Sequence, residues 1–239
     1  MKPITSKHLI VVALMFLSSC VAYYPQVVDI PLITGKRDIR VDAGIFLAPN
    51  IHGSEANKNA GKNDDSTVYP LADAGVHASF SYGLTDILAI QAYFSFDAAL
   101  RFHLQGALVA YHAFENKTVI EMYGGFGYGN GLINSLAGTR DDYFLSFTQF
   151  NIGKVDQGSS HIDYGLGLKG GYIFCNFDNI WRQETIHKQN GWLIEPSVFF
   201  RFGGRKAKYC TKVNYLWTNT IEDDWYIPLC MSMVVNLNF

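Results

Sequence analysis

The sequence of 239 residues lacks several features by which common classes of protein are recognised. Beyond its N-terminal segment it has no run of about 18 apolar residues, which excludes a transmembrane helix there. Its net charge is −2 and no basic patch with interleaved aromatics is present, so we expect no nucleic-acid partner. None of its 4 cysteines belongs to a Cys-x-x-Cys pair or a Cys/His cluster with metal-ligand spacing, so we expect neither a metal nor another cofactor.

The overall composition is intermediate between two classes of protein. A mean hydropathy of +0.05 with 15% aromatic residues is high for a soluble domain and low for a bundle of membrane helices. A membrane protein that crosses with strands has this balance, because its strands alternate apolar and polar residues.

The first 19 residues have the features of an export signal. Lys2 and Lys7 precede the apolar stretch LIVVALMFL, which is too short to span a membrane stably. The stretch ends in Leu17-Ser18-Ser19-Cys20, which resembles a bacterial lipobox. The cysteine of a lipobox receives a diacylglyceryl group and becomes the first residue of the mature chain. We expect lipidation of Cys20 by lipoprotein-processing enzymes; a plain signal peptide with an incidental cysteine is the alternative.

The three remaining cysteines are Cys175, Cys210 and Cys230. An odd number in an exported protein leaves at least one thiol unpaired. We expect all three to be single residues of a strand wall, and whether two of them form a disulfide stays open.

From residue 38 onward, apolar and polar residues alternate, as they do in strands with one apolar face. The pattern predicts ten strands at about 38–49, 70–83, 86–98, 101–114, 117–129, 142–153, 161–175, 192–203, 208–219 and 227–239. Each is long enough to cross a bilayer at a tilt, which takes about 9–11 residues.

The predicted connections alternate in length. Long polar segments at 50–69, 130–141, 176–191 and 220–226 alternate with short turns at 84–85, 115–116, 154–160 and 204–207, and residues 99–100 form the one short member of the long set. Short turns on one side and long loops on the other are typical of an outer-membrane barrel with its turns in the periplasm. An even number of strands also returns the C-terminus to the periplasm.

Each strand has one apolar and one polar face. In 192–203 the apolar face holds Trp192, Ile194, Pro196, Val198, Phe200 and Phe202, and the polar face holds Leu193, Glu195, Ser197, Phe199 and Arg201. Strands 86–98, 117–129 and 161–175 divide in the same way. Strand 101–114 is ambiguous, because either orientation leaves one histidine facing outward.

Two kinds of barrel fit this pattern: a secreted barrel with an apolar interior, and a membrane barrel with an apolar exterior. Aromatic residues favour the membrane barrel because they gather near both strand ends, as at two membrane interfaces. They are Tyr82, Phe114, Phe202, Tyr209 and Phe239 near the turns, and Trp192, Trp217, Trp225 and Tyr226 near the loops. We therefore predict an all-β, up-and-down antiparallel transmembrane barrel with outer-membrane lipids around it. The last residue, Phe239, resembles the signal read by barrel-assembly machinery.

A barrel of ten strands has a narrow lumen, since about eight strands are already filled by side chains. Charges there must pair, because an unpaired buried charge costs several kcal/mol. Lumen-facing glycines make room for these side chains and for Tyr123 and Phe199. The expected lumen charge network consists of Arg40, Asp42, Asp73, Glu121, Asp163, Lys169, Glu195, Arg201 and Lys212. The lumen is then plugged or nearly so.

Several segments are familiar. YGLTDILAIQAYFSF (82–96), IEMYGGFGYGNG (120–131), YFLSFTQFNIG (143–153) and the start CVAYYPQVVDIPLITGKRDIRVDAG (20–44) resemble small outer-membrane β-barrel lipoproteins of the Bacteroidota. The resemblance implies location and fold, and no particular chemistry. The predicted organisation is a signal peptide (1–19), a lipidated tether (20–37) made extended by Pro25 and Pro31, and the barrel (38–239). No acidic cluster follows Cys20, so we expect the anchor in the periplasmic leaflet.

Four smaller motifs are relevant to chemistry. His103 and Asp97 lie near one rim, where a His/Asp pair orients a base, but a rim hydrogen bond is the simpler explanation. Acidic pairs at 64–65, 141–142 and 223–224 lack the spacing of a calcium site. Asp65-Ser66-Thr67 resembles an O-glycosylation sequon of exported Bacteroidota proteins, which assigns Ser66. The glycines of GFGYGNG continue a strand and open no helix, which argues against phosphate binding.

The sequence thus predicts a non-enzymatic barrel with a filled polar lumen and a structural or partner-binding role through its extracellular loops. Two alternatives stay open: an enzyme of hydrolase type active at the rim, and a narrow channel for small solutes. Any protein partner in the cell envelope is unidentified.

Overall fold

The computed structural model describes residues 30–50, 71–97, 101–131, 139–155, 162–179, 184–204, 206–218 and 229–239. The signal peptide, Cys20, Ser66, Trp225 and Tyr226 lie outside these ranges. In the described part of the chain, no helix is long and apolar enough to cross a membrane.

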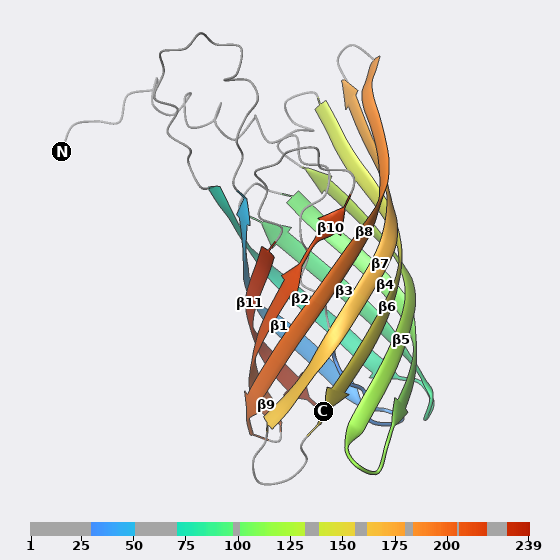
Figure 1. Cartoon of the computed structure of the whole chain (residues 1–239), viewed down its shortest axis with the longest axis vertical. Helices are drawn as coiled ribbons and strands as arrows, with labels where there is room; N and C mark the ends of the chain where they lie inside the picture. Colours follow the sequence, from blue (N-terminus) through green and yellow to red (C-terminus); the bar gives the residue numbers. More distant parts are fainter. Residues whose placement is uncertain are drawn as a thin grey trace, which may run out of the picture.

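The chain forms a closed antiparallel barrel (Figure 1). Each strand pairs with the next from β1 to β9, and β11 lies between β9 and β1. Because β9 and β10 are two parts of one strand, the wall has ten strands. The bounds are β1 (Ile39–Asn50), β2 (Leu71–Gly83), β3 (Leu88–Asp97), β4 (Arg101–Ala113), β5 (Thr118–Gly131), β6 (Thr139–Lys154), β7 (Ile162–Asn179), β8 (Glu184–Gly203), β9 (Ala207–Tyr215), β10 (Trp217–Thr218) and β11 (Leu229–Asn238).

The predicted barrel of ten strands is confirmed, and most strand bounds lie within a few residues of the prediction. The largest difference is β8, which begins at Glu184 and not at 192. It continues to pair with β7 as far as Asn179, across an irregularity at Phe177/Asp178. The added segment ETIHKQN is polar on both faces, so it has no alternation from which a strand is predicted.

One end of the barrel carries the short connections 84–87, 114–117 and 204–206, and is here called the turn end. The C-terminus lies at the turn end (Figure 1), where the Phe239 amide donates to the Ile39 carbonyl. At the opposite end, the loop end, the gaps in the description include 51–70 and 219–228.

The outer surface is an apolar belt. The predicted outward faces of β3, β5, β7 and β8 are confirmed, with exposed fractions such as 61% for Phe126 and 50% for Val198. The orientation of β4 is now settled: His103 is fully buried, while His112 faces outward and packs edge-on against Phe114. An apolar belt around a closed barrel is the surface that hydrocarbon requires.

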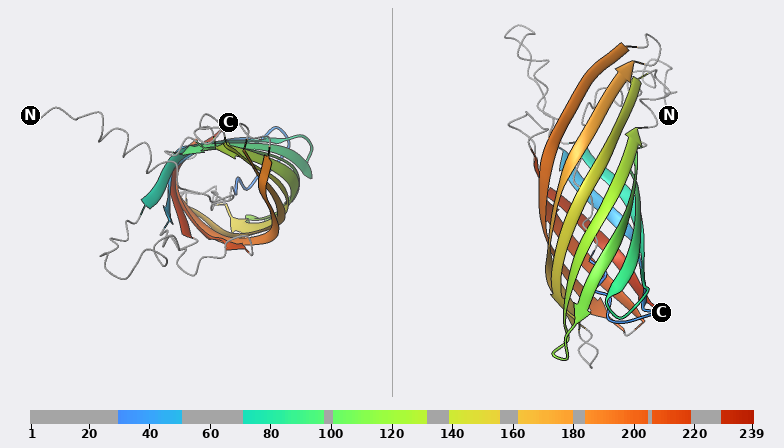
Figure 2. Two further views of the ribbon diagram at one scale, coloured as in Figure 1. Left: turned by 90° about the horizontal axis from the view of Figure 1, so that it is seen from above. Right: turned by 90° about the vertical axis from the view of Figure 1, so that its right-hand side faces the viewer.

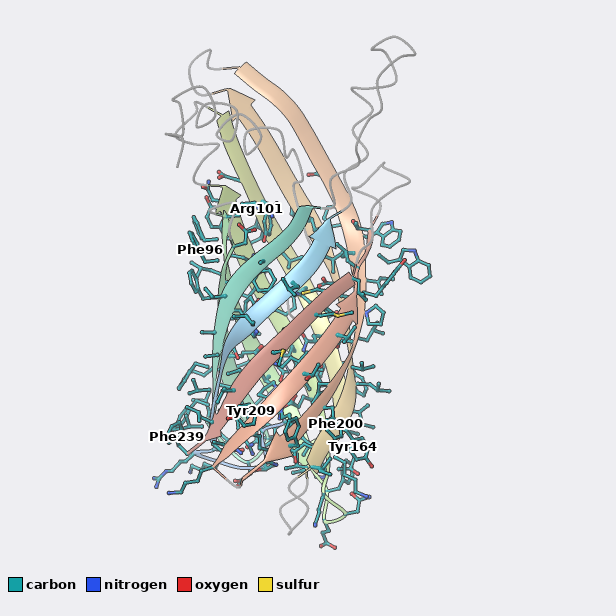
Figure 3. All side chains as sticks on the ribbon, turned by 90° about the vertical axis from the view of Figure 1, so that its left-hand side faces the viewer. Phe96, Arg101, Tyr164, Phe200, Tyr209 and Phe239 are labelled. Carbon is teal, nitrogen blue, oxygen red and sulfur yellow. The ribbon has the colours of Figure 1, made fainter. Side chains whose placement is uncertain are left out.

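Aromatic side chains stand at both ends of this belt. Tyr164, Phe200, Tyr209 and Phe239 gather toward the turn end (Figure 3), and Phe239 is 74% exposed. Trp192 and Trp217 are exposed on the neighbouring segments β8 and β10. The arrangement matches the aromatic girdles of membrane barrels.

Among the described residues, the hydrogen-bond ladder between β8 and the strand formed by β9 and β10 is interrupted. Pairing of β8 with β9 stops at Ser197↔Asn214 and resumes with β10 at Ile194↔Trp217. Pro196 lies in the gap, and a proline has no N–H to donate to a neighbouring strand. An outward-facing apolar groove of about 510 Å³ runs past this point, lined among others by Leu166, Leu168, Pro196, Val198 and Tyr215.

The lumen contains more than strand side chains. Residues 30–34, which precede β1, lie inside the ring of strands (Figure 2, blue), and Ile30, Leu32 and Ile33 have no exposed surface. The sequence analysis took residues 20–37 as a tether. Of that range the structure describes 30–37, and residues 30–33 are packed in the barrel interior.

A charge on the outer belt tests the orientation of the wall. Leu108 is near the middle of β4 and 55% exposed, so Leu108→Arg is expected to lower the free energy of unfolding by about 2–4 kcal/mol in lipid vesicles. The matched change Tyr209→Arg, at the turn end, is expected to cost about 0–1 kcal/mol. Urea titration of both variants measures the difference. Equal costs at the two positions would contradict the assigned membrane span.

Candidate functional site in the lumen

The segment Ile30-Pro31-Leu32-Ile33, here called the lumen segment, fits against glycines of the wall. A Cβ at Gly167 of β7 would lie 2.8 Å from Ile30 Cδ1, and one at Gly153 of β6 would lie 2.8 Å from Leu32 Cδ1. Both contacts are closer than real side chains allow. The two glycines therefore leave the space that the apolar side chains of the lumen segment occupy.

Arg201 holds the lumen segment from one side. Its Nη1 donates to the Pro31 carbonyl at 3.1 Å, and its Nη2 donates to the Ile30 carbonyl. The guanidinium also lies 4.7 Å from the centre of the Phe199 ring. Arg201 is fully buried, and the planar fork of a guanidinium suits two neighbouring acceptors.

Glu121 holds the lumen segment by accepting a hydrogen bond from its backbone, whereas Arg201 donates hydrogen bonds to it. Its Oε1 accepts the Ile33 amide at 2.8 Å. Its Oε2 accepts from the Tyr123 hydroxyl at 2.7 Å and from Asn151 Nδ2 at 3.0 Å. Glu121 is fully buried, so these donors replace the water that a carboxylate would otherwise bind.

After Ile33 the chain turns at the turn end and enters β1. Asp38 organises this turn: its Oδ2 accepts from the Thr34 amide and hydroxyl, both at 2.9 Å, and from Arg40 Nη2 at 2.9 Å. The Arg37 amide donates to the Gly83 carbonyl at 2.8 Å. Leu32 has a φ of 55°, in the left-handed region that a leucine rarely adopts. The packing around it must therefore offset a backbone strain of about 1–3 kcal/mol.

Two close ion pairs each join two strands that are second neighbours in the barrel wall. Lys212 of β9 donates to Asp42 of β1 at 2.7 Å, and Asn236 also donates to this carboxylate. Lys208 of β9 donates to both oxygens of Asp163 of β7 at 2.6 and 2.7 Å. All these side chains are buried, where an ion pair needs good geometry to offset the loss of hydration.

A chain of polar contacts continues toward the loop end. Lys169 lies 3.8 Å from Glu195 and 4.7 Å from the centre of the Phe147 ring, and it donates to Gln105 Oε1 at 3.1 Å. The Gln105 amide nitrogen contacts His103 Nε2. An amide nitrogen only donates hydrogen bonds, so Nε2 of His103 accepts one from Gln105. The proton of the neutral His103 ring is therefore on Nδ1, and Nδ1 donates to the Tyr143 hydroxyl oxygen 2.5 Å away. His103 is thus used on both nitrogens.

His103 belongs to a row of aromatic rings that runs from strand to strand along the inner face of the barrel wall. Phe46, His77, Tyr93, His103 and Tyr143 follow one another across β1, β2, β3, β4 and β6, with centroids 5.3–6.3 Å apart. Asp97, the suggested partner of His103, instead accepts from the Arg101 amide at 3.0 Å and from its Nε at 2.7 Å. The structure therefore does not bring His103 and Asp97 together as a catalytic pair.

The structure places eight of the nine predicted lumen charges inside the barrel, and the side chain of Asp73 lies outside the described residues. It pairs Lys212 with Asp42 and brings Lys169 near Glu195. It directs Arg201 and Glu121 to the backbone of the lumen segment. Arg40 contacts Asp38 and also donates to Asn238 Oδ1 at 2.6 Å, neither of which was predicted.

Sequence reasoning missed three contributors to this interior. Lys208 shares a strand face with Lys212, so alternation along 208–212 was a usable signal for it. The lumen segment carried only a short apolar run. Arg101 follows Asp97 by four residues, and this spacing alone does not indicate that the two side chains pair. Cys210 and Cys230 are buried free thiols, and the side chain of Cys175 lies outside the described residues.

Comparison with known proteins gives structural likeness only. No protein-family model and no curated protein sequence matches the chain. Ail, the attachment invasion locus protein of Yersinia pestis, matches at 9% identity and a TM-score of 0.37 over 85% of this chain and 99% of its own. The outer membrane protein OprG of Pseudomonas aeruginosa matches at 10% identity and a TM-score of 0.41 over 86% of this chain and 97% of its own.

A side chain at Gly167 tests the fit of the lumen segment. Gly167→Ala places a Cβ 2.5 Å from Ser197 Oγ and 2.8 Å from both Asn151 Oδ1 and Ile30 Cδ1, so we expect a loss of about 1–3 kcal/mol in the free energy of unfolding. The matched control is Gly124→Ala, whose Cβ meets nothing within 4 Å. Urea unfolding of both variants in vesicles compares them. If Gly167→Ala is as mild as the control, the packing of Ile30 against β7 is wrong.

Removing one ion-pair partner tests the lumen charges. Lys208→Met takes away the ammonium that neutralises Asp163, with an expected loss of about 3–5 kcal/mol. Combining it with Asp163→Leu is expected to recover most of that loss, since a buried pair adds little over apolar residues of similar size. The same unfolding measurement on the single and double variants gives the coupling energy. Strictly additive losses would show that the two side chains do not interact.

Proposed function

We propose that the chain is a non-enzymatic outer-membrane barrel lipoprotein with a filled polar lumen. Its role is structural, or it binds a partner through the connections at the loop end. The exposed apolar belt and the aromatic residues at both ends support a position across the bilayer. Long connections join β1 to β2 and β10 to β11. Long loops on the cell exterior would give the protein a surface for binding a partner.

One observation carries the proposal: residues 30–33 are buried inside the ring of strands. The lumen segment, the ion pairs of Lys208 and Lys212 and the ring row occupy the interior from the turn end upward. A solute would have to displace these buried contacts to pass. A barrel with a filled lumen is suited to hold its loops in place, and it is poorly suited to act as an open pore.

The rim-active enzyme receives no support from the contacts of its suggested residues. His103 is hydrogen-bonded through both nitrogens, and Asp97 is engaged with Arg101. A general base needs a free acceptor within reach of a substrate proton. Loss of a hydrolase activity on His103→Ala would nevertheless count for that alternative.

The lipid anchor at Cys20 and its place in the periplasmic leaflet are part of this proposal. Two or three acyl chains give stable anchoring where one does not. Mass spectrometry of the N-terminal peptide, compared with Cys20→Ala, tests the modification. Phe239 as a barrel-assembly signal and Ser66 as a glycosylation site remain predictions.

Planar bilayer recordings test the sealed lumen. We expect no conductance steps from the wild-type protein, because the lumen segment blocks the interior. The variant Leu32→Asp/Ile33→Asp is expected to conduct, because two charges cannot stay in the apolar space that these side chains fill. Lys36→Asp, a charge on an exposed residue of the following turn, is the control and should stay silent.

Frequent steps from the wild-type protein would overturn the sealed barrel in favour of the narrow channel. Each variant is first checked by its heat-dependent shift on a denaturing gel, so that a misfolded barrel is not scored as silent.

A further inference from the structure

We infer that the turn-end half of the lumen is a binding site for a short apolar peptide with a left-handed backbone at its third residue, and that residues 30–33 occupy it within the same chain. The site therefore accepts a peptide of the same class from another molecule once its own segment is displaced. The inference deepens the proposed function, since it takes the lumen as sealed by this segment.

The site recognises main-chain atoms. Arg201 donates to the carbonyls of Ile30 and Pro31, and Glu121 accepts the amide of Ile33. These contacts involve three of four consecutive residues and no side chain of the bound segment. Main-chain hydrogen bonds of this kind give affinity for any peptide that follows the same backbone path.

Side-chain selectivity comes from the spaces at two glycines. Gly167 leaves room for Ile30, and Gly153 leaves room for Leu32. Ile30 and Leu32 also pack in one buried cluster with Val119, Phe199 and Val234. The second position is a proline, whose missing N–H needs no acceptor in the lumen. The preferred peptide is thus apolar at its first, third and fourth positions and tolerates proline at its second.

The charges of the site favour an occupied over an empty lumen. Arg201 and Glu121 are both fully buried, and the segment supplies backbone partners to each. Taking a partner from a buried charge costs several kcal/mol. Exchange of one peptide for another keeps those hydrogen bonds, so it avoids the cost of leaving the site empty.

The lumen segment is covalently linked to β1, and this link determines how strongly it competes with a free peptide for the site. Only the turn 34–38 separates the lumen segment from β1, and a short link gives the attached occupant an effective concentration in the millimolar range or above. A free peptide therefore binds measurably only when the attached segment is weakened. The test therefore requires a variant in which the attached segment binds its site weakly.

The test measures binding of a fluorescent synthetic peptide, IPLITGKR (residues 30–37), to full-length protein in detergent by fluorescence anisotropy. Leu32→Asp/Ile33→Asp is expected to bind it saturably, and wild type at least about tenfold more weakly because its site is occupied. Adding Arg201→Gln to the double variant is expected to weaken binding by about tenfold or more, since it removes charged hydrogen bonds. Ile33→Asp alone is the second background if the double variant loses its heat-dependent gel shift.

Two controls make the result specific. A peptide with Asp at the Leu32 and Ile33 positions should not bind, and Lys36→Asp should behave as wild type. The inference is overturned if a folded variant shows no saturable binding, if the two peptides bind alike, or if Arg201→Gln has no effect. These failures leave the proposed function intact, because that function fails on a different result: conductance through the wild-type protein.

Discussion

The cost of burying charge in a narrow lumen is the constraint on which the interior of this barrel depends. The wall turns its apolar faces to the membrane, so its polar residues must point inward, where little water remains to solvate them. Each buried charge meets this constraint through a specific neighbour. Lys208 and Lys212 use carboxylates from other strands, whereas Arg201 and Glu121 use the backbone of the lumen segment. The lumen segment thereby supplies backbone partners to two of these buried charges.

Glycine and charge act together in holding that segment. Gly153 and Gly167 give the wall two hollow positions for Leu32 and Ile30, and Arg201 with Glu121 fix the backbone between and beside them. The close packing offsets the left-handed backbone at Leu32. The lumen segment is therefore held by local features of four strands, β5 to β8.

Much of the fold was predictable from the sequence because successive residues of a membrane-barrel strand face lipid and lumen alternately. The alternation in β7 predicted both its position and its faces, and the alternation in β8 predicted its faces and its C-terminal end but not its start. The alternation of long and short connections predicted the topology. β4 was ambiguous because His103 and His112 have opposite parity, and only packing decides which one is buried. The lumen segment was not predictable: four apolar residues with a proline look the same in a tether as in a lumen. Pairings such as Lys208 with Asp163 depend on register and side-chain reach across neighbouring strands, which alternation does not contain.

The central claim is that residues 30–33 lie inside the barrel, and hydrogen exchange tests it most directly. The protein would be reconstituted in lipid nanodiscs and the exchange of its peptides followed by mass spectrometry. If the account is right, the peptide covering residues 30–34 exchanges as slowly as amides of β5, because the Ile33 amide is bonded to a buried carboxylate. If that peptide exchanges as fast as the exposed turn at residues 84–87, the lumen segment is not where the structure places it.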